Sequence, residues 1–357
     1  VFREPGVPIR IEDVDVDAPG PREVLVRTAA AGVCHSDLSI VDGTITALYG
    51  LPMVLGHESA GVVEAVGSDV TYVEPGDHVV TCLSIFCGEC EYCLSGRPAL
   101  CPHESQRRAS GERPRLSQAG VGLTPASQLG SFAERLLVHE HAVVKIDRAM
   151  PLDLASVLGC GLTTGLGAVI YTAGVRPGQT VAVIGCGGVG LGAVQGARLS
   201  GARRIVAVDR VAARLDRAAR LGATDVIDAS QGDAVAAVLD RTGGVDHVFE
   251  AVGRAETCQQ ALKMLGRGGR VTIIGVITTL KLEISGADLM YGRSLGWSMM
   301  GSNRFRLDIP YYVELYLQGR LQLDDIVTAR VPLQDVNEAL AALSRAEGAR
   351  TVLLFDR

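Results

Sequence analysis

The sequence lacks a strong excess of charge and any long apolar run without glycine. Its 357 residues carry a formal charge of −6 at pH 7, so it has no positive surface suited to nucleic acid or an anionic membrane. Residues 154–175 and 177–197 contain no charged side chain, but glycines break both segments. We interpret them as buried structure rather than membrane spans. The sequence also lacks repeats and low-complexity tracts. No basic, apolar leader opens it, so we expect a cytoplasmic protein.

The length favours two domains, because one core rarely organises so long a chain. Up to about residue 150, short β-type segments such as 23–33 and 60–67 are separated by turn signals, which predicts an antiparallel, barrel-like half. From Thr180 onward, strand-like and helix-like segments alternate. This alternation predicts an α/β fold with a doubly wound parallel sheet. The last sixty residues return to a mixed pattern, with helices expected near 310–318 and 336–344.

A glycine-rich segment, VAVIGCGGVG, joins the first strand of that sheet to a helix. It places Gly185, Gly187 and Gly190 in the pattern G-x-G-x-x-G, where glycine permits a tight turn and close approach to a pyrophosphate. Asp209 ends the next strand, where a carboxylate binds a ribose 2′-hydroxyl and repels a 2′-phosphate. The segment therefore predicts a dinucleotide site that favours NAD over NADP. Arg210, beside the carboxylate, weakens this preference slightly.

Four of the nine cysteines lie within fifteen residues, with the spacing C-x2-C-x2-C-x7-C: Cys87, Cys90, Cys93 and Cys101. In a reducing compartment this spacing favours tetrahedral thiolate coordination of zinc over disulfides. An iron–sulfur cluster and a nucleic-acid zinc ribbon are the competing interpretations. Four protein ligands leave no position for substrate, so we expect a structural zinc.

A second candidate ligand set is dispersed along the chain. Cys34 lies in GVCHSD, His57 in GHES and Cys160 in GCGLTTG. Two thiolates and one imidazole leave the fourth position of zinc open, as in catalytic sites. Each residue alone has a simpler explanation, since cysteine is often merely buried and a single histidine is often a structural hydrogen-bonding group.

Other features have less specific interpretations. Five arginines and two glutamates lie between residues 97 and 115, which indicates a solvated loop or, alternatively, a surface that attracts an anion. Cys82, Cys186 and Cys258 belong to neither ligand set. We expect them to be buried as small apolar side chains.

The order of these motifs along nearly the whole chain resembles the zinc-dependent medium-chain alcohol dehydrogenases. The resemblance implies a GroES-like catalytic domain over 1–161, completed by 301–357, and an inserted Rossmann NAD-binding domain over 162–300. It also implies a homodimer or homotetramer joined through the Rossmann sheets. The implied reaction interconverts an alcohol and its aldehyde or ketone by hydride transfer to or from NAD, with one catalytic and one structural zinc per chain.

Several residue roles follow from the resemblance alone. Cys34, His57 and Cys160 would bind the catalytic zinc. Glu58 would lie beside it, either as a carboxylate behind the ligands or as a transient ligand. Asp37 would orient the histidine, and Ser36 would receive the alcohol proton. Further positions around the cofactor are His35, Thr164, Gly188, Val189 and Arg350. Of these, His35 and Arg350 would face the pyrophosphate.

The sequence departs from the family pattern at two places. Ser39 stands where many members have a histidine that completes proton transfer, so the relay must end elsewhere, through water or His35. The segment GTITALYG at 43–50 has no acidic residue, which argues against a glutathione adduct as substrate. A nicotinoprotein with tightly bound NAD and a thiol-adduct dehydrogenase are the alternatives within the enzyme class. A non-catalytic protein that binds NAD and zinc is the alternative from another class.

Overall fold

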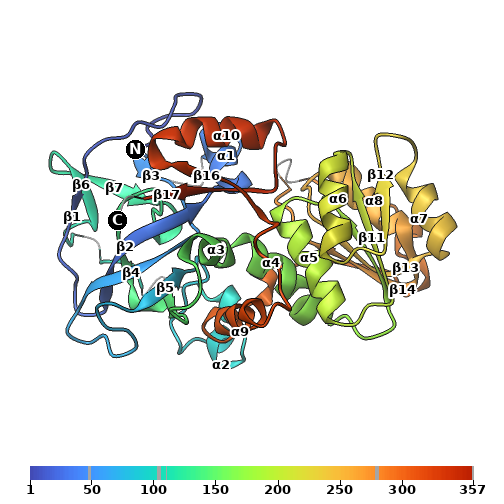
Figure 1. The fold of residues 1–357 in the computed structure, drawn as a ribbon, viewed down its shortest axis with the longest axis horizontal. Helices are drawn as coiled ribbons and strands as arrows, with labels where there is room; N and C mark the ends of the chain where they lie inside the picture. The colour runs from blue at the N-terminus through green and yellow to red at the C-terminus, as the bar shows by residue number, and fades with distance from the viewer. Residues whose placement is uncertain (47–49, 103–105, 110, 278–280, 356–357) are drawn as a thin grey trace. The chain divides into compact units, whose positions relative to one another are not determined.

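The computed structural model describes residues 1–46, 50–102, 106–109, 111–277 and 281–355. The chain forms two compact units, one of residues 1–160 with 304–357 and the other of residues 161–303. These boundaries lie within three residues of the expected ones. The blue and red ends of the chain therefore belong to the same unit (Figure 1).

The first unit is built on a seven-stranded sheet in the order β16-β17-β2-β4-β5-β9, with β8 also paired to β2. Its strands are β2 (Glu23–Gly32), β4 (Ser59–Val66), β5 (His78–Thr81), β8 (Arg135–His139), β9 (Val143–Lys145), β16 (Val327–Pro332) and β17 (Arg350–Leu354). All pairs are antiparallel except β16 with β17. Strand β17 pairs with β2 in the register Val352 to Gly32, so the C-terminal segment completes a sheet begun near the N-terminus (Figure 1).

Among its described residues, this unit also has a smaller sheet and five α-helices. The sheet has the order β1-β6-β7-β3 and consists of β1 (Asp15–Val16), β6 (Leu116–Gln118), β7 (Val121–Pro125) and β3 (Met53–Val54). The helices are α1 (His35–Val41), α2 (Glu91–Leu94), α3 (Leu152–Ser156), α9 (Phe305–Leu317) and α10 (Val336–Ser344). Along β2, Val24 and Val26 are fully buried between more exposed neighbours, as expected for a strand with one face on the core.

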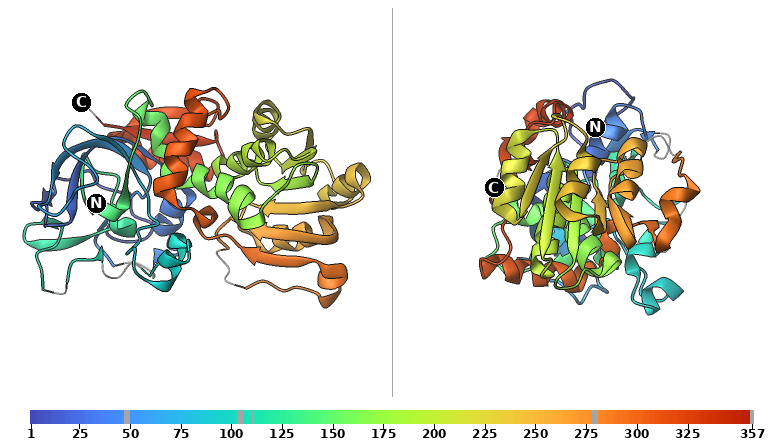
Figure 2. Two further views of the ribbon diagram at one scale, coloured as in Figure 1. Left: turned by 90° about the horizontal axis from the view of Figure 1, so that it is seen from below. Right: turned by 90° about the vertical axis from the view of Figure 1, so that its right-hand side faces the viewer.

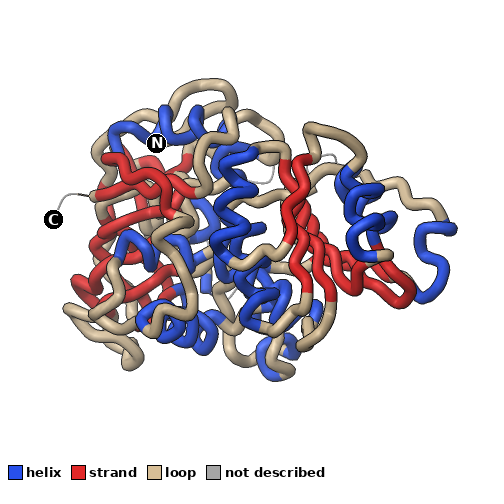
Figure 3. Tube along the Cα trace, turned by 45° about the vertical axis from the view of Figure 1, so that its right-hand side comes forward, coloured by secondary structure: helices blue, strands red, loops and turns tan. Residues whose placement is uncertain are grey.

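The second unit is a parallel sheet in the order β12-β11-β10-β13-β14-β15. This is the Rossmann arrangement, in which the strand order reverses beside the first strand. The strands are β10 (Thr180–Ile184), β11 (Arg204–Asp209), β12 (Asp225–Asp228), β13 (Val245–Glu250), β14 (Leu265–Ile273) and β15 (Ser294–Trp297). The α-helices are α4 (Gly161–Gly167), α5 (Gly188–Leu199), α6 (Ala212–Leu221), α7 (Ala234–Thr242) and α8 (Ala255–Met264). The strands form one twisted layer with helices on both faces (Figures 2 and 3).

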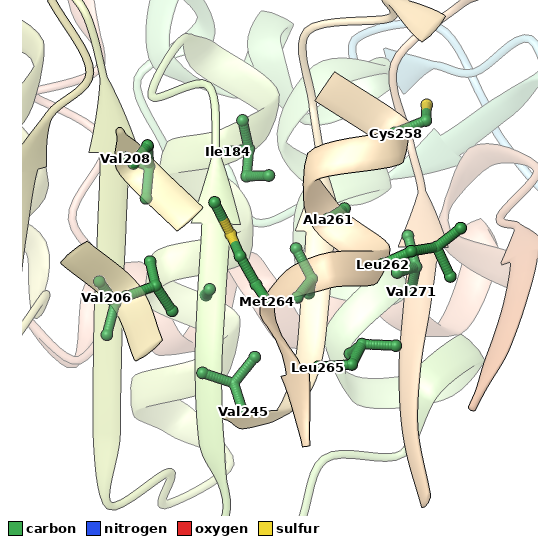
Figure 4. Packing of buried hydrophobic residues seen from close by; sticks show 14 of the residues in the cluster. Ile184, Val206, Val208, Val245, Cys258, Ala261, Leu262, Met264, Leu265 and Val271 are labelled. Atoms are coloured by element: carbon green, nitrogen blue, oxygen red, sulfur yellow. The ribbon is translucent and has the colours of Figure 1, made fainter. Parts of the chain in front are cut away.

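The core of the second unit lies between the sheet and its helices. In Figure 4, side chains of α8 and the start of β14 lie over side chains from the neighbouring strands. The labelled residues in this packing include Ile184, Val206, Ala261, Leu262, Met264 and Val271. All six are at most 4% exposed, so the strands are apolar on this face for most of their length. A rigid sheet of this kind fixes the positions of the loops at the carboxyl ends of its strands.

The expected elements appear close to their predicted positions, with one displaced helix start. Helix α10 has the predicted bounds, whereas the helix expected from residue 310 begins at Phe305. The structure starts the helix earlier because the Asp308 carboxylate accepts a hydrogen bond from the Arg304 amide at 2.6 Å, which satisfies an otherwise unpaired donor.

Within the part of the chain that the structure describes, no single helix has the length and apolar character needed to cross a membrane. One bent pair of short helical segments, Leu152–Gly159 with Gly161–Ala173, meets the length and composition criteria together.

The interpretation of the arginine-rich segment as a solvated loop is wrong for Arg108 and Arg115. Arg108 contacts Asp17 at 2.7 Å and Glu23 at 2.5 Å, and Arg115 contacts the second oxygen of Glu23 at 2.7 Å. Burial alone would raise the pKa of Glu23, but hydrogen bonds from the two arginines outweigh it and lower this pKa to about 2. These arginines therefore hold the segment onto β2 and are already neutralised, which also weakens the alternative of an anion-attracting surface.

We expect Glu23→Gln to lower Tm at pH 7 by roughly 5 °C or more, because removing one partner leaves Arg115 as an uncompensated buried charge. The folded pKa of Glu23 lies below the ordinary value of 4.5, so its contribution is present above pH 4.5 and is lost as the pH falls towards 2. Urea unfolding between pH 7 and pH 3 should show the difference between variant and parent shrinking with acidity. Glu64→Gln, which removes an exposed pairing with Arg135, is the matched control. Equal stability of the Glu23 and Glu64 variants would contradict the assignment.

Candidate metal centres and cofactor site

The structure brings Cys34, His57 and Cys160 together in the first unit. Cys34 lies just after β2 and is the N-cap of α1. His57 lies two residues before the start of β4. Cys160 follows a 3-10 turn that comes after α3. One side-chain ligand atom from each lies within 4.8 Å of the others, and all three residues are buried. Three segments far apart in the sequence therefore form one compact donor set.

The carboxylate of Asp37 holds two of these residues in place. One of its oxygens lies 3.3 Å from His57 Nδ1 and accepts a hydrogen bond from the Gly56 amide at 3.1 Å. The other oxygen accepts a hydrogen bond from the Cys34 amide at 3.1 Å. Asp37 is fully buried, so these bonds compensate the cost of desolvating its charge. Engaging Nδ1 leaves Nε2 of His57 as the nitrogen available for a metal ion.

The chemistry of this donor set fits zinc. Zinc–sulfur bonds of about 2.3 Å and zinc–nitrogen bonds of about 2.1 Å place tetrahedral ligands roughly 3.5–3.8 Å apart, within the spacing observed here. A hydrogen bond from Cys160, together with the charges of Arg350 and His57, holds the pKa of the Cys34 thiol well below its usual range despite burial. A lowered thiol pKa favours the thiolate, which is the form that binds a metal.

Glu58 and Arg350 form a buried ion pair beside this set. Arg350 Nη1 lies 3.0 Å from Glu58 Oε1 and donates to the Val33 carbonyl at 3.0 Å. A Cβ at Gly32 would lie 2.6 Å from the Glu58 carboxylate, so only glycine fits there. Glu58 is not in the group of mutually close ligand atoms found among the described residues. The contact of Arg350 with a pyrophosphate remains a prediction.

The second set, Cys87, Cys90, Cys93 and Cys101, also has its sulfurs within 4.8 Å of one another. The Cys87–Cys93 and Cys90–Cys101 sulfur pairs are each 3.8 Å apart, which is too long for a disulfide and suits a shared tetrahedral ion. The amides of Glu89 and Cys90 point at the Cys87 sulfur, and the Glu89 amide is the main cause that lowers the pKa of this thiol to about 7. The local chain thus stabilises a thiolate at Cys87.

The base of this four-cysteine loop is held by residues that the sequence analysis missed. His141 Nδ1 lies 2.7 Å from the Phe86 carbonyl, and the two rings stack with centroids 4.5 Å apart. Arg306 of α9 lies over the rings of Tyr72 and Phe86. Phe86 immediately precedes the first ligand, so this packing fixes where the loop begins. No local pattern links these residues, because their contacts join segments far apart in the chain.

In the second unit, the glycine-rich segment lies between β10 and α5, as predicted. Gly185 has φ +91°, a left-handed conformation that favours glycine. A Cβ at Gly190 would lie 1.7 Å from the Gly185 carbonyl oxygen, so the helix can approach the strand only without one. At Gly187 a Cβ would meet no described atom within 4 Å. This open space at the N-terminus of a twelve-residue helix fits a dinucleotide pyrophosphate.

Asp209 ends β11 and contacts the loop directly. One carboxylate oxygen accepts a hydrogen bond from the Cys186 amide at 2.7 Å. The other oxygen accepts hydrogen bonds from the amides of Arg210 at 2.7 Å and Val211 at 3.0 Å. Asp209 therefore ties the glycine-rich loop to the end of the neighbouring strand, a role that the sequence did not reveal. Each carboxylate oxygen retains acceptor capacity, so the expected contact with a ribose hydroxyl remains compatible with this geometry.

The remaining predicted residues fall in both units. His35 is exposed and Ser36 is partly buried, both in the first turn of α1, and Ser39 lies on the same helix. In the second unit, Gly188 and Val189 begin α5, and the Thr164 hydroxyl of α4 lies 3.5 Å from the Met300 sulfur. Residues 47–49 of the expected loop 43–50 lie outside the described residues. Three further cysteines are fully buried, as predicted: Cys82, Cys186 and Cys258.

Comparison with known proteins identifies relatives over the whole chain. Residues 20–148 match the alcohol dehydrogenase GroES-like domain, and residues 188–317 match the zinc-binding dehydrogenase domain. An NDMA-dependent alcohol dehydrogenase of Amycolatopsis methanolica is 37% identical, over 100% of this chain and 98% of its own. A probable S-(hydroxymethyl)glutathione dehydrogenase of Schizosaccharomyces pombe is 38% identical, over 98% and 94%. The crystal structure of an alcohol dehydrogenase zinc-binding domain protein from Burkholderia ambifaria is 37% identical, with a TM-score of 0.93 over 99% of this chain and 97% of that one.

We expect two zinc ions per chain that differ in lability. A chelator should remove the ion of the three-ligand set first, because that set leaves a coordination position open, whereas four thiolates should retain theirs longer. Metal analysis during timed chelation should show loss from two zinc per chain to one and then to none. Cys160→Ser should abolish the fast phase, and Cys93→Ser the slow one. One zinc per chain in the parent, or bound iron, would contradict the assignment.

We expect Asp209→Gly to shift the ratio of kcat/KM for the two cofactors towards NADP, because it removes a charge that repels a 2′-phosphate. Affinity for NAD should fall as well, because the amides of Cys186, Arg210 and Val211 lose their acceptor. Asp228→Gly is a suitable control, since Asp228 ends the adjacent strand and its carboxylate accepts hydrogen bonds from Ser230 within its own turn. A ratio that does not change would show that another group recognises the ribose.

Proposed function

The chain belongs to the zinc-dependent medium-chain alcohol dehydrogenases, and we propose that it oxidises an alcohol, or reduces the matching carbonyl compound, at Cys34, His57 and Cys160 with NAD as hydride carrier. The observation that carries this assignment is the buried group of two sulfurs and one imidazole within 4.8 Å, oriented by Asp37. Four protein ligands would suit a purely structural ion. Three leave a position for a substrate oxygen.

Zinc held by these three residues would act as a Lewis acid that polarises the substrate oxygen and lowers its pKa. The protein itself contributes burial and orientation. Asp37 keeps the His57 imidazole in one tautomer, and the Glu58–Arg350 pair places balanced charge beside the ligands. Burial of all three ligands limits access of water, which strengthens electrostatic interactions at the reacting oxygen.

Ser36 is the residue that we assign to the alcohol proton. It lies two residues after Cys34 in the first turn of α1, so its hydroxyl is carried by the same helix that begins at a metal ligand. With Ser39 at the position where many relatives of this family have histidine, the proton leaves Ser36 through water or through the exposed His35.

The cofactor site is assigned to the carboxyl end of the second unit's sheet. The open space at Gly187 would receive the pyrophosphate, and Asp209 would bind the adenosine ribose. NAD supplies the hydride acceptor in alcohol oxidation and the donor in the reverse reaction. Thr164, Val189, Arg210 and the pair His35 and Arg350 are the further candidate contacts.

A nicotinoprotein is the second candidate function. It is favoured by the full-length similarity to an NDMA-dependent alcohol dehydrogenase. Similarity of the same extent to S-(hydroxymethyl)glutathione dehydrogenases keeps a thiol adduct among the substrates to be tested. The lack of an acidic residue at 43–50 is the argument against that substrate.

One experiment tests these alternatives together. Zinc-loaded protein is assayed with a panel of alcohols and aldehydes that includes the formaldehyde adduct of glutathione, with and without added NAD, and with NDMA as acceptor. Nucleotide released on denaturation is measured in parallel. Turnover that requires added NAD supports the main proposal, whereas turnover with NDMA and retained nucleotide supports the nicotinoprotein. Zinc-loaded protein that turns over no member of the panel under any condition would contradict both.

We also propose a cytoplasmic homodimer or homotetramer. Free thiols in both ligand sets suit a reducing compartment. Strand β15 is at the edge of the Rossmann sheet, and Trp297 on it is half exposed, as are Tyr291 and Met299 nearby. An exposed edge strand with apolar side chains is suited to pairing with a second copy.

We expect Ser36→Ala to lower kcat by about 10²–10⁴-fold, because the alcohol proton loses its positioned acceptor while zinc and NAD still bind. Ser36→Thr should retain most activity, since it keeps the hydroxyl. Ser39→Ala, on the same helix, is the matched control and should change kcat little. His35→Gln should lower kcat if histidine ends the relay, and only NAD affinity if it faces the pyrophosphate. Normal turnover by Ser36→Ala with full zinc content would rule out the relay.

A further inference from the structure

Glu250 is a fully buried carboxylate at the carboxyl end of β13, the strand beside β10. Its Oε1 accepts three hydrogen bonds, from the amides of Val252 and Gly253 at 2.9 Å each and from the Thr257 hydroxyl at 2.8 Å. Burial is the largest effect on its pKa and raises it, while these donors act in the opposite sense. The Cys258 thiol lies against the same carboxylate. A buried carboxylate is costly unless such bonds compensate it, which suggests a task beyond filling space.

The main chain of the same residue organises a second loop. The Glu250 carbonyl accepts the amides of Ile274 at 2.8 Å and Gly275 at 2.9 Å, directly after β14. A Cβ at Gly275 would lie 2.4 Å from the Gly253 amide, and a Cβ at Gly253 would lie 2.3 Å from the Val276 carbonyl. The side chain of Glu250 therefore binds the turn 251–253. Its main-chain carbonyl binds the segment after β14, which packs against this turn.

The turn held by Glu250 also contacts the glycine-rich loop. The Ala251 amide donates to the Ile184 carbonyl at 2.8 Å, and a Cβ at Gly185 would lie 2.7 Å from a methyl group of Val252. Val252 is nevertheless 44% exposed. The apolar side chain of Val252 thus packs on the backbone of the phosphate loop, and part of this side chain remains exposed. In open α/β sheets, ligands bind at this edge, outside the carboxyl ends of the strands.

We propose that Glu250 is a positioning residue for NAD, whose carboxylate fixes the turn 251–253 so that Val252 forms an apolar wall beside the Gly185 loop. The inference rests on the proposed NAD site. A wall held in place before binding loses less conformational freedom on binding, so it contributes to affinity without touching the reacting atoms. The turn itself holds no charged side chain, so the effect of Glu250 passes through geometry.

The test uses nucleotide-free, zinc-loaded protein and measures NAD affinity by calorimetry, Tm, and kcat at saturating NAD. Glu250→Gln keeps one acceptor oxygen but loses the charge, so its three hydrogen bonds weaken. We expect NAD affinity to fall roughly tenfold with kcat nearly unchanged. Glu256→Gln, at an exposed residue of helix α8 next to Thr257, is the matched control and should bind NAD like the parent.

A second variant separates positioning from stability. Val252→Ala truncates the wall and leaves the hydrogen bonds of Glu250 intact, so it tests the wall even where the Glu250 variant folds poorly. If Glu250 acts through Val252, the double variant should lose much less NAD affinity than the two single losses combined. Parent-like NAD affinity in Val252→Ala, or in a folded Glu250→Gln with lowered Tm, would overturn the proposal. Failure of the parent to bind NAD would instead refute the cofactor assignment on which it rests.

Discussion

The buried ion pair between Glu58 and Arg350 depends on strands from opposite ends of the chain. Glu58 directly precedes β4, Arg350 opens β17, and both strands pair with β2. A buried charge without its partner costs several kcal/mol, about 3–5 when one member is removed. The pairing of β17 with β2 is therefore needed for the charge balance beside Cys34 and Cys160, and with it for a stable metal site.

The parts of the protein that were predictable from the sequence are those with a local signal. The glycine-rich loop, the four-cysteine loop and helix α10 each lie within one short segment, where spacing or periodicity reveals the structure. The dispersed ligands Cys34, His57 and Cys160 were recognised through the order of motifs, because no local pattern connects them. Their spatial grouping needed the structure.

What the sequence concealed are contacts between distant segments. Glu23 gave no sign that it would neutralise Arg108 and Arg115, which lie more than eighty residues away. In the sequence, Glu250 looks like an ordinary residue at the end of a strand. The amides that donate hydrogen bonds to it belong to a turn, and packing on Gly185 sets the shape of that turn. Burial and hydrogen-bond partners are properties of the folded chain, so charged residues in the interior are the hardest to interpret from a sequence.

The shared sheet of the two chain ends has a consequence for biosynthesis. The unit of residues 161–303 is one continuous segment and can complete its sheet while the ribosome is still translating. The other unit needs β17 (Arg350–Leu354), which is synthesised after the whole segment 161–303. Until β17 has been made, β2 lacks one of its neighbours and Glu58 lacks its counterion. The unit that holds both cysteine sets therefore completes its sheet after the other unit's segment has been made.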